Sequence, residues 1–244
     1  MRPKVLSIAG FDPSAGAGIL ADIKVFEFHK VYGLGVCSAI TYQNDSEFIG
    51  LDWISTNEII KQLEILYKKF NIEYIKIGIV NNLSALQSII DFLISKNKNV
   101  KIIWDPILRA TAGFDFHQSI NNEDLKTILK KIHLITPNLE EFNTIFKTNI
   151  EAFENLYDCN ILIKGIENNN SVEDVLITKK NNRCNFSGNK FESYSKHGTG
   201  CALSSAITAN LANELDLIKS CSNAKNYVEK LLVSNNSLLA YHNI

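Results

Sequence analysis

Residues 5–29 read VLSIAGFDPSAGAGILADIKVFEFH, and this stretch sets the expected architecture. Val5–Ala9 is a short apolar run that predicts a buried strand, and Ile19–His29 has the apolar spacing of a helix. The segment between them, Gly10–Gly18, is rich in glycine and alanine, so its backbone can approach a ligand closely at the start of the helix. A tight turn followed by a helix cap explains the same residues equally well.

A different interpretation of this loop is the dinucleotide-binding fingerprint G-x-G-x-x-A, which Gly16–Ala21 fits. In that fingerprint the first glycine stands at the end of the strand, whereas here the six residues from Gly10 to Ala15 intervene. The spacing therefore argues against an oxidoreductase that uses a dinucleotide.

Strand-like and helical patterns alternate along the rest of the chain. The expected strands are Gly35–Thr41, Tyr74–Ile79, Val100–Trp104, His133–Thr136, Asn160–Lys164 and Asp174–Thr178, and the expected helices are Thr56–Phe70, Leu83–Lys96, Asp124–Ile132, Leu139–Phe146, Cys201–Asn213 and Ser220–Tyr241. The alternation predicts a parallel sheet covered by helices on both faces, in one α/β domain spanning residues 1–244. Ligands bind such sheets at the carboxyl ends of the strands, so the residues that follow each strand are the candidates for a site.

Composition narrows the class of protein. The 244 residues are 45% hydrophobic and 21% charged, and the formal net charge is -1, so no basic excess is available for nucleic acid or an anionic membrane. No apolar run approaches the ~20 residues of a membrane span, and the start of the chain lacks the apolar region of a signal peptide. The five cysteines are scattered, which is typical of reduced thiols in the cytoplasm. We therefore expect a cytoplasmic globular enzyme.

Acidic and amide side chains follow two of the expected strands. Asp105 stands at the tip of one strand, where a carboxylate can meet a metal ion, although Asp-Pro also commonly opens turns. Asn138 and Glu141 follow the next strand, at the start of a helix. They are spaced either to hold the water ligands of Mg²⁺ beside phosphate groups or to form a helix capping box. The residues alone leave both alternatives open.

The most specific segment is KHGTGCALSSA, residues 196–206. Two glycines flank Thr199 ahead of a helix of small residues, and successive backbone N–H groups at a helix start form a cradle for an anion. Cys201 falls in the first turn of that helix, a position that lowers the pKa of a thiol. A buried structural cysteine is the simpler explanation of a lone thiol, and His197 is expected to make local hydrogen bonds. The segment alone does not separate an anion site from a cysteine nucleophile.

Seven segments occur in the order typical of one family. They are GFDPSAGAGILADIK (10–24), YQN (42–44), KIGIV (76–80), DPIL (105–108), TPNLEE (136–141), IKG (163–165) and HGTGC (197–201). Over essentially the whole chain, the sequence resembles the bacterial hydroxymethylpyrimidine/phosphomethylpyrimidine kinases of thiamine biosynthesis, in the ribokinase-like superfamily. This resemblance implies a three-layer α/β/α fold with a central, mainly parallel sheet and a small strand lid over the acceptor.

The resemblance also implies the reaction and the acceptor site. ATP would phosphorylate 4-amino-5-hydroxymethyl-2-methylpyrimidine and then its monophosphate. The catalytic residues would be Cys201, Gly198, Thr199 and Gly200, which form an anion hole for the transferring phosphoryl group with Cys201 in the position of a base. The substrate-binding residues would be Gln43, which reads the pyrimidine, together with Ala17, Asp22, Ile79 and Ile107.

On the nucleotide side, the resemblance implies that Lys164, Asn138 and Glu141 bind ATP and that Asp105 and Glu141 organise Mg²⁺. It also implies a homodimer. The sequence departs from the family at Ala15, where a glycine is usual, and at Ile79, where methionine is common.

Three alternatives remain. A pyridoxine or pyridoxal kinase of the same superfamily is the neighbouring one, against which Gln43-Asn44 favours the pyrimidine. A nucleotide-binding regulator without turnover is disfavoured because Asp105, Glu141 and Cys201 are all present. A cysteine hydrolase that uses Cys201 and His197 lacks a visible acidic partner for the histidine.

Overall fold

The computed structural model describes residues 2–107, 122–168, 171–189 and 196–243, and so leaves out Leu108, the last residue of the DPIL segment. Nine strands in these ranges form one sheet in the order β3-β2-β1-β4-β5-β6-β7-β8-β9. The strands are β1 (Lys4–Phe11), β2 (Tyr32–Gln43), β3 (Phe48–Trp53), β4 (Tyr74–Ile77), β5 (Lys101–Trp104), β6 (Leu134–Ile135), β7 (Ile161–Asn168), β8 (Ser171–Ile177) and β9 (Arg183–Asn189). Six neighbouring strands are parallel, namely β2, β1, β4, β5, β6 and β7. The strand β3 at one edge and the strands β8 and β9 at the other are antiparallel to their neighbours.

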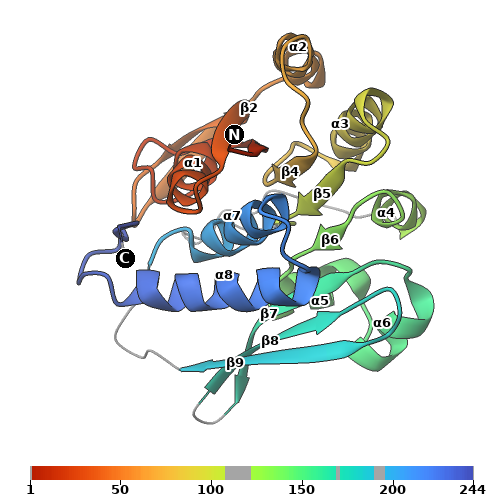
Figure 1. The fold of residues 1–244 in the computed structure, drawn as a ribbon, viewed down its shortest axis with the longest axis vertical. Helices are drawn as coiled ribbons and strands as arrows, with labels where there is room; N and C mark the ends of the chain where they lie inside the picture. The colour runs from red at the N-terminus through yellow and green to blue at the C-terminus, as the bar shows by residue number, and fades with distance from the viewer. Residues whose placement is uncertain (1, 108–121, 169–170, 190–195, 244) are drawn as a thin grey trace.

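Helices cover both faces of this sheet (Figure 1). They are α1 (Gly18–Phe28), α2 (Thr56–Tyr67), α3 (Leu83–Lys96), α4 (Asn122–Leu129), α5 (Leu139–Phe146), α6 (Ile150–Leu156), α7 (Thr199–Ala212) and α8 (Leu217–Leu232). Helices α1, α7 and α8 lie on one face and α2, α3, α4 and α6 on the other, and buried aliphatic side chains of the strands pack against both groups. The predicted three-layer architecture with a mainly parallel sheet is confirmed.

Side-chain caps fix where most of these helices begin. Ser55 and Glu58 form a capping box at α2, and the Asn82 side chain accepts a hydrogen bond from a backbone N–H at the start of α3. Helix α7 differs, because its N-cap is Gly198 in the left-handed conformation (φ 79°) without a side-chain cap. Its first backbone N–H groups are therefore left for another partner.

Three short elements were not predicted, and one predicted helix is too long. The strands β3 and β9 lie at the sheet edges, where polar and apolar residues mix, and α6 has only 7 residues. The expected helix Ser220–Tyr241 is wrong beyond Leu232. There the side chains of Ser234 and Asn235 hydrogen-bond to nearby backbone groups, which favours turns over a continued helix.

Candidate active site

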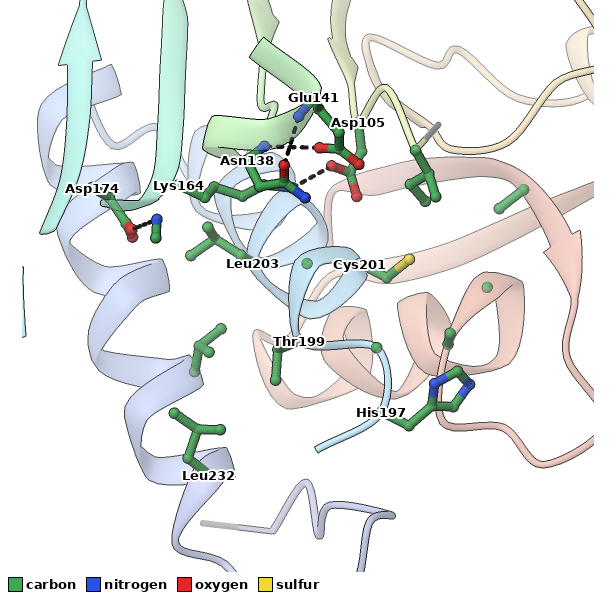
Figure 2. A pocket seen from close by; sticks show the side chains of 18 of the residues that line it. Asp105, Asn138, Glu141, Lys164, Asp174, His197, Thr199, Cys201, Leu203 and Leu232 are labelled. Atoms are coloured by element: carbon green, nitrogen blue, oxygen red, sulfur yellow. Dashed lines mark hydrogen bonds and ion pairs between the residues drawn. The ribbon is translucent and has the colours of Figure 1, made fainter. Parts of the chain in front are cut away.

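A cavity of about 560 Å³ lies at the carboxyl ends of the parallel strands. Residues within three positions of the ends of three neighbouring strands line it: Ile79 after β4, Asp105 after β5 and Asn138 after β6. Figure 2 shows the side chains of Asp105 and Asn138 near the start of α7, which carries Thr199 and Cys201. Apart from Asp22, every predicted site residue lines the cavity, namely Ala17, Gln43, Ile79, Asp105, Ile107, Asn138, Glu141, Lys164, Gly198, Thr199, Gly200 and Cys201.

The start of α7 forms one wall of the cavity. Gly198 turns the chain with a positive φ, and a Cβ there would stand 2.0 Å from the backbone oxygen of Gly16, so only glycine fits. A Cβ at Gly200 would stand 3.3 Å from Nζ of Lys164 and 3.9 Å from Oδ2 of Asp105. An anion held by the first N–H groups of α7 would thus lie beside the Lys164 ammonium group.

Lys164 and Asp105 form an ion pair across the cavity floor, with Nζ 2.7 Å from Oδ1. Thr136 donates a hydrogen bond to the same carboxylate oxygen, at 3.1 Å, and the side chain of Asp105 is fully buried. Burial alone would raise the pKa of Asp105, but Lys164 and Lys76 hold it below its ordinary value. Asp105 is therefore an anion, and the Lys164 ammonium group balances its charge. Phosphate groups of a ligand would also attract this ammonium group.

Asn138 and Glu141 form the capping box of α5. The Asn138 side chain accepts a hydrogen bond from Glu141 N at 2.8 Å, and Glu141 Oε2 accepts one from Asn138 N at 2.7 Å. Both residues also line the cavity, and the Glu141 carboxylate is close enough to raise the pKa of Lys164 together with Asp105. The helix capping box predicted as one alternative is thus formed, and the Glu141 carboxylate still lies beside the cavity.

The structure places Asp22 behind the cavity wall. Asp22 is on the buried face of α1, where both of its oxygens accept hydrogen bonds from Nζ of Lys76, at 3.0 and 2.8 Å. The hydroxyls of Ser7 and Ser205 donate to the same carboxylate. Asp22 therefore reaches the cavity only through Lys76, which lines it.

The expectation of a lowered thiol pKa at Cys201 is wrong. Cys201 does fall in the first turn of α7, but burial raises its pKa to about 11 despite the nearby Lys76 ammonium group. Lys76 helps little because Asp22 neutralises its charge. At neutral pH the side chain in the described structure is a thiol.

The end of the cavity near β2 and β3 carries the predicted acceptor residues. Gln43 is the last residue of β2, and its side-chain amide donates a hydrogen bond to Thr41 Oγ1 at 2.9 Å. Ile79 supplies an apolar wall opposite Gly10, where a Cβ would stand 2.6 Å from the Ile79 side chain. Phe48, the first residue of β3, lines the same end.

Sequence reasoning missed the opposite end. Lys225 of α8 pairs with Asp174 of β8, with Nζ 3.2 Å from Oδ2, and the other Asp174 oxygen accepts a hydrogen bond from Gly165 N at 2.9 Å. Val228 and Leu232 of α8 also line the cavity, and Figure 2 shows Leu232 on this helix. No motif marked these residues, but the apolar spacing of the last helix was a usable signal for its buried face.

The side chains at the cavity determine how it could hold a metal ion. Among the described residues, no group of three or more His, Cys, Asp or Glu side chains could by itself hold a metal ion. Mg²⁺ is commonly bound through one or two carboxylates together with substrate phosphates and water, and Asp105 and Glu141 fit that arrangement.

In the part of the chain that the structure describes, no helix has the length and apolar character needed to span a membrane.

Comparison with known proteins agrees with this geometry. Residues 12–243 match the protein family described as phosphomethylpyrimidine kinase. A hydroxymethylpyrimidine/phosphomethylpyrimidine kinase of Aquifex aeolicus (strain VF5) is 32% identical over 246 residues, which cover 96% of this chain and 95% of that protein.

Solved structures agree as well. The phosphomethylpyrimidine kinase of Clostridium difficile 630 has a TM-score of 0.76 at 26% identity, covering 94% of this chain and 99% of that one. A pyridoxal kinase of Staphylococcus aureus in complex with ADP has a TM-score of 0.83 at 23% identity, covering 100% and 96%, which shows a shared fold. The chain therefore belongs to the phosphomethylpyrimidine kinase family.

Proposed function

We propose that this chain transfers the γ-phosphoryl group of ATP to 4-amino-5-hydroxymethyl-2-methylpyrimidine and then to its monophosphate, as a cytoplasmic step of thiamine biosynthesis. The observation that carries the proposal is one continuous cavity that has an amide and an aromatic ring at one end and, beside the start of α7, a lysine and carboxylates. The name of the Aquifex aeolicus relative supports the choice of acceptor.

At the acceptor end, Gln43 supplies both an amide donor and a carbonyl acceptor, which match the ring nitrogen and the amino group of an aminopyrimidine. Ile79, Ile107 and Phe48 surround this end with apolar surface suited to an aromatic ring. Ala17 lines the same wall with only a methyl group, so a ring can lie close to the backbone.

At the phosphoryl end, the first N–H groups of α7 and the Lys164 ammonium group would neutralise the phosphoryl oxygens. Nucleotide phosphates would compete with Asp105 for Lys164, whose pKa lies above its ordinary value because the carboxylates of Asp105 and Glu141 outweigh its burial. Mg²⁺ held by Asp105 and Glu141 through water would supply further charge neutralisation at the phosphates. Asn138 would keep Glu141 oriented through the capping box.

In the transfer, the bond between the γ-phosphorus and the bridging oxygen of ATP breaks as the acceptor oxygen bonds to phosphorus, and ADP leaves. The first acceptor is an alcohol whose proton must also leave, and Cys201 would accept it only in its thiolate form. The second acceptor is a phosphate monoester that is largely ionised at neutral pH and requires no base. One site can therefore carry out both steps. We also propose a homodimer, as in the family.

The test is ADP release from Mg-ATP with purified protein, offered the hydroxymethylpyrimidine, its monophosphate, pyridoxal, pyridoxine and ribose in parallel. We expect turnover on the two pyrimidines alone. A Gln43→Leu variant should raise the KM for the pyrimidine and leave the KM for ATP unchanged, because Gln43 lies at the acceptor end. Turnover confined to the vitamin B6 compounds would instead assign a pyridoxal kinase, and binding of ATP without turnover would assign a regulator.

A further inference from the structure

His197 and Asp12 form a buried pair between two loops that are 185 residues apart in the sequence. Nε2 of His197 lies 2.9 Å from Oδ2 of Asp12, and the two side chains are 8% and 1% exposed. The prediction that His197 makes local hydrogen bonds is therefore wrong, because its side-chain partner belongs to the distant loop that follows β1. Neither residue has a role in the function proposed above.

The Asp12 carboxylate also organises its own loop. Oδ1 accepts hydrogen bonds from the backbone N–H and the hydroxyl of Ser14, and Oδ2 accepts one from the backbone N–H of Ala17, each at 2.8 Å. Ala17 lines the cavity, where the proposed function gives it to the acceptor. Asp12 Oδ2, which accepts the hydrogen bond from His197, thus also holds the backbone of Ala17 in place.

The two loops are in close contact at two glycines. A Cβ at Gly16 would stand 2.4 Å from Cδ2 of His197, and a Cβ at Gly198 would stand 2.0 Å from the backbone oxygen of Gly16. Figure 2 shows His197 directly before the turn that leads to Thr199 and Cys201. A shift of one loop therefore requires a shift of the other.

The backbone of the second loop is also held from behind by the C-terminal segment. His197 N donates a hydrogen bond to the Leu238 oxygen at 2.9 Å, and Nζ of the neighbouring Lys196 donates to the side chain of Asn235 at 2.8 Å. With the backbone held in this way, the His197 side chain is a connection from this loop to the loop Gly10–Gly18.

We infer that His197 is a positioning residue: through Asp12 it fixes the loop that holds the acceptor against the loop that holds the transferring phosphoryl group. The inference rests on the proposed function, because in that reaction the two loops hold the two reactants. Phosphoryl transfer depends on the separation and alignment of the attacking oxygen and phosphorus. Displacing a reactant by about 1 Å lowers a rate by roughly 10²-fold.

The test compares three variants with the wild type. His197→Ala removes the donor, whereas His197→Gln keeps an N–H at about the distance of Nε2. Ser14→Ala is the matched control, because it removes a hydrogen bond to the same carboxylate that stays within one loop. His197→Asn, whose amide is too short to replace Nε2, serves in place of alanine if that variant does not fold.

We expect His197→Ala to lower kcat for both acceptors about 100-fold, with the KM for ATP unchanged. His197→Gln should restore most of kcat, and Ser14→Ala should keep wild-type kcat. Thermal unfolding midpoints are measured for all variants, so that a loss of stability is recognised. Wild-type kcat in His197→Ala, or no rescue by glutamine in a folded variant, would overturn the inference.

Amide hydrogen exchange provides a readout that does not need turnover. His197→Ala should speed exchange at Ala17 and at residues 199–201 together, whereas Ser14→Ala should leave residues 199–201 at the wild-type rate. If the wild type transfers no phosphoryl group to any acceptor, the proposed function fails, and the exchange data still decide whether the loops are coupled. Exchange that rises in only one loop of His197→Ala would overturn the coupling.

Discussion

Cys201, the proposed base of the first step, is a thiol at neutral pH in the described structure. Burial raises its pKa to about 11, so the thiolate fraction at neutral pH is small and grows about tenfold per pH unit. If the thiolate accepts the alcohol proton, kcat for the first phosphorylation should rise by about tenfold per pH unit above neutrality, and kcat for the second should stay flat. Stopped assays of each step between pH 6.5 and 9 would measure this difference.

The variant Cys201→Ala distinguishes a side chain that accepts a proton from one that only shapes the cavity wall. The first step should lose its pH slope and most of its rate, while the second step should change little. Cys221→Ala is the control, because it removes another buried thiol whose pKa is raised, on α8 and outside the cavity lining. Equal losses in both steps would show that Cys201 shapes the wall and accepts no proton.

The Lys76–Asp22 pair makes a second prediction at the residue scale. Both side chains are completely buried, and although burial alone would lower the pKa of Lys76, the Asp22 carboxylate keeps it raised. Lys76→Met would leave Asp22 charged and unpaired, so we expect the free energy of unfolding to fall by about 3–5 kcal/mol. Urea denaturation would measure this change.

Two controls accompany this prediction. The double variant Lys76→Met with Asp22→Asn should recover part of the loss, because the uncompensated charge is removed. Lys219→Met breaks an ion pair with Asp216 in which the side chains are 72% and 57% exposed, and it should change stability little. A single Lys76→Met variant as stable as the wild type would show that the buried ion pair contributes nothing to stability.

At the scale of elements, the start of α5 combines a helix cap with a candidate Mg²⁺ site. Glu141→Gln keeps an oxygen that can accept the Asn138 backbone N–H, so the capping box and the thermal midpoint should be preserved. The negative charge is lost, and we expect the Mg²⁺ concentration at half-maximal activity to rise about tenfold or more. Magnesium titrations of ADP release, paired with thermal unfolding, would measure both quantities.

The opposite change isolates the cap. Asn138→Ala removes the acceptor for Glu141 N and should lower stability by about 1 kcal/mol. A Glu141→Gln variant with unchanged magnesium dependence would show that Glu141 only caps α5.

Elements were predictable where local signals were complete. The bounds of α3 and α5 match the expected Leu83–Lys96 and Leu139–Phe146, because each has an asparagine cap followed by helical apolar spacing. The signals failed for β9, where exposed and half-buried residues alternate without a fully buried position. Helix α6 had a usable signal in its Asn149 cap, but 7 residues contain too few apolar positions to establish a period.

At the scale of the whole molecule, the sequence predicted which residues gather at the cavity because parallel strands bring their ends together. It could not predict pairings that depend on how loops pack, such as His197 with Asp12 or Lys225 with Asp174. Asp22 shows the same limit, since its place in a motif did not reveal that it lies on the buried face of α1. Charge balance inside the molecule is a property of the tertiary structure.

Three histidines link the stability of the whole molecule to pH. Burial lowers the pKa of His29, His133 and His242 to about 4, from an ordinary value of 6.5. Between these values the unfolded chain binds protons that the folded protein does not, so stability should be constant above about pH 6.5 and fall as the pH drops toward 4. The slope is at most about 1.4 kcal/mol per pH unit for each histidine.

Urea denaturation at pH 8, 6.5, 5.5 and 4.5 would test this window. His133→Gln should reduce the slope of the free energy of unfolding against pH by the contribution of one proton, because the amide cannot titrate. The other two histidines would account for the remaining slope. The lowered pKa values of Asp12 and Asp105 act in a separate range, below the ordinary value of 3.8, where protonation would break their pairs with His197 and Lys164. Stability that holds from pH 6.5 to 4.5 and collapses only below 3.8 would place the acid sensitivity in these carboxylates and show that the histidines are accessible to protons in the folded protein.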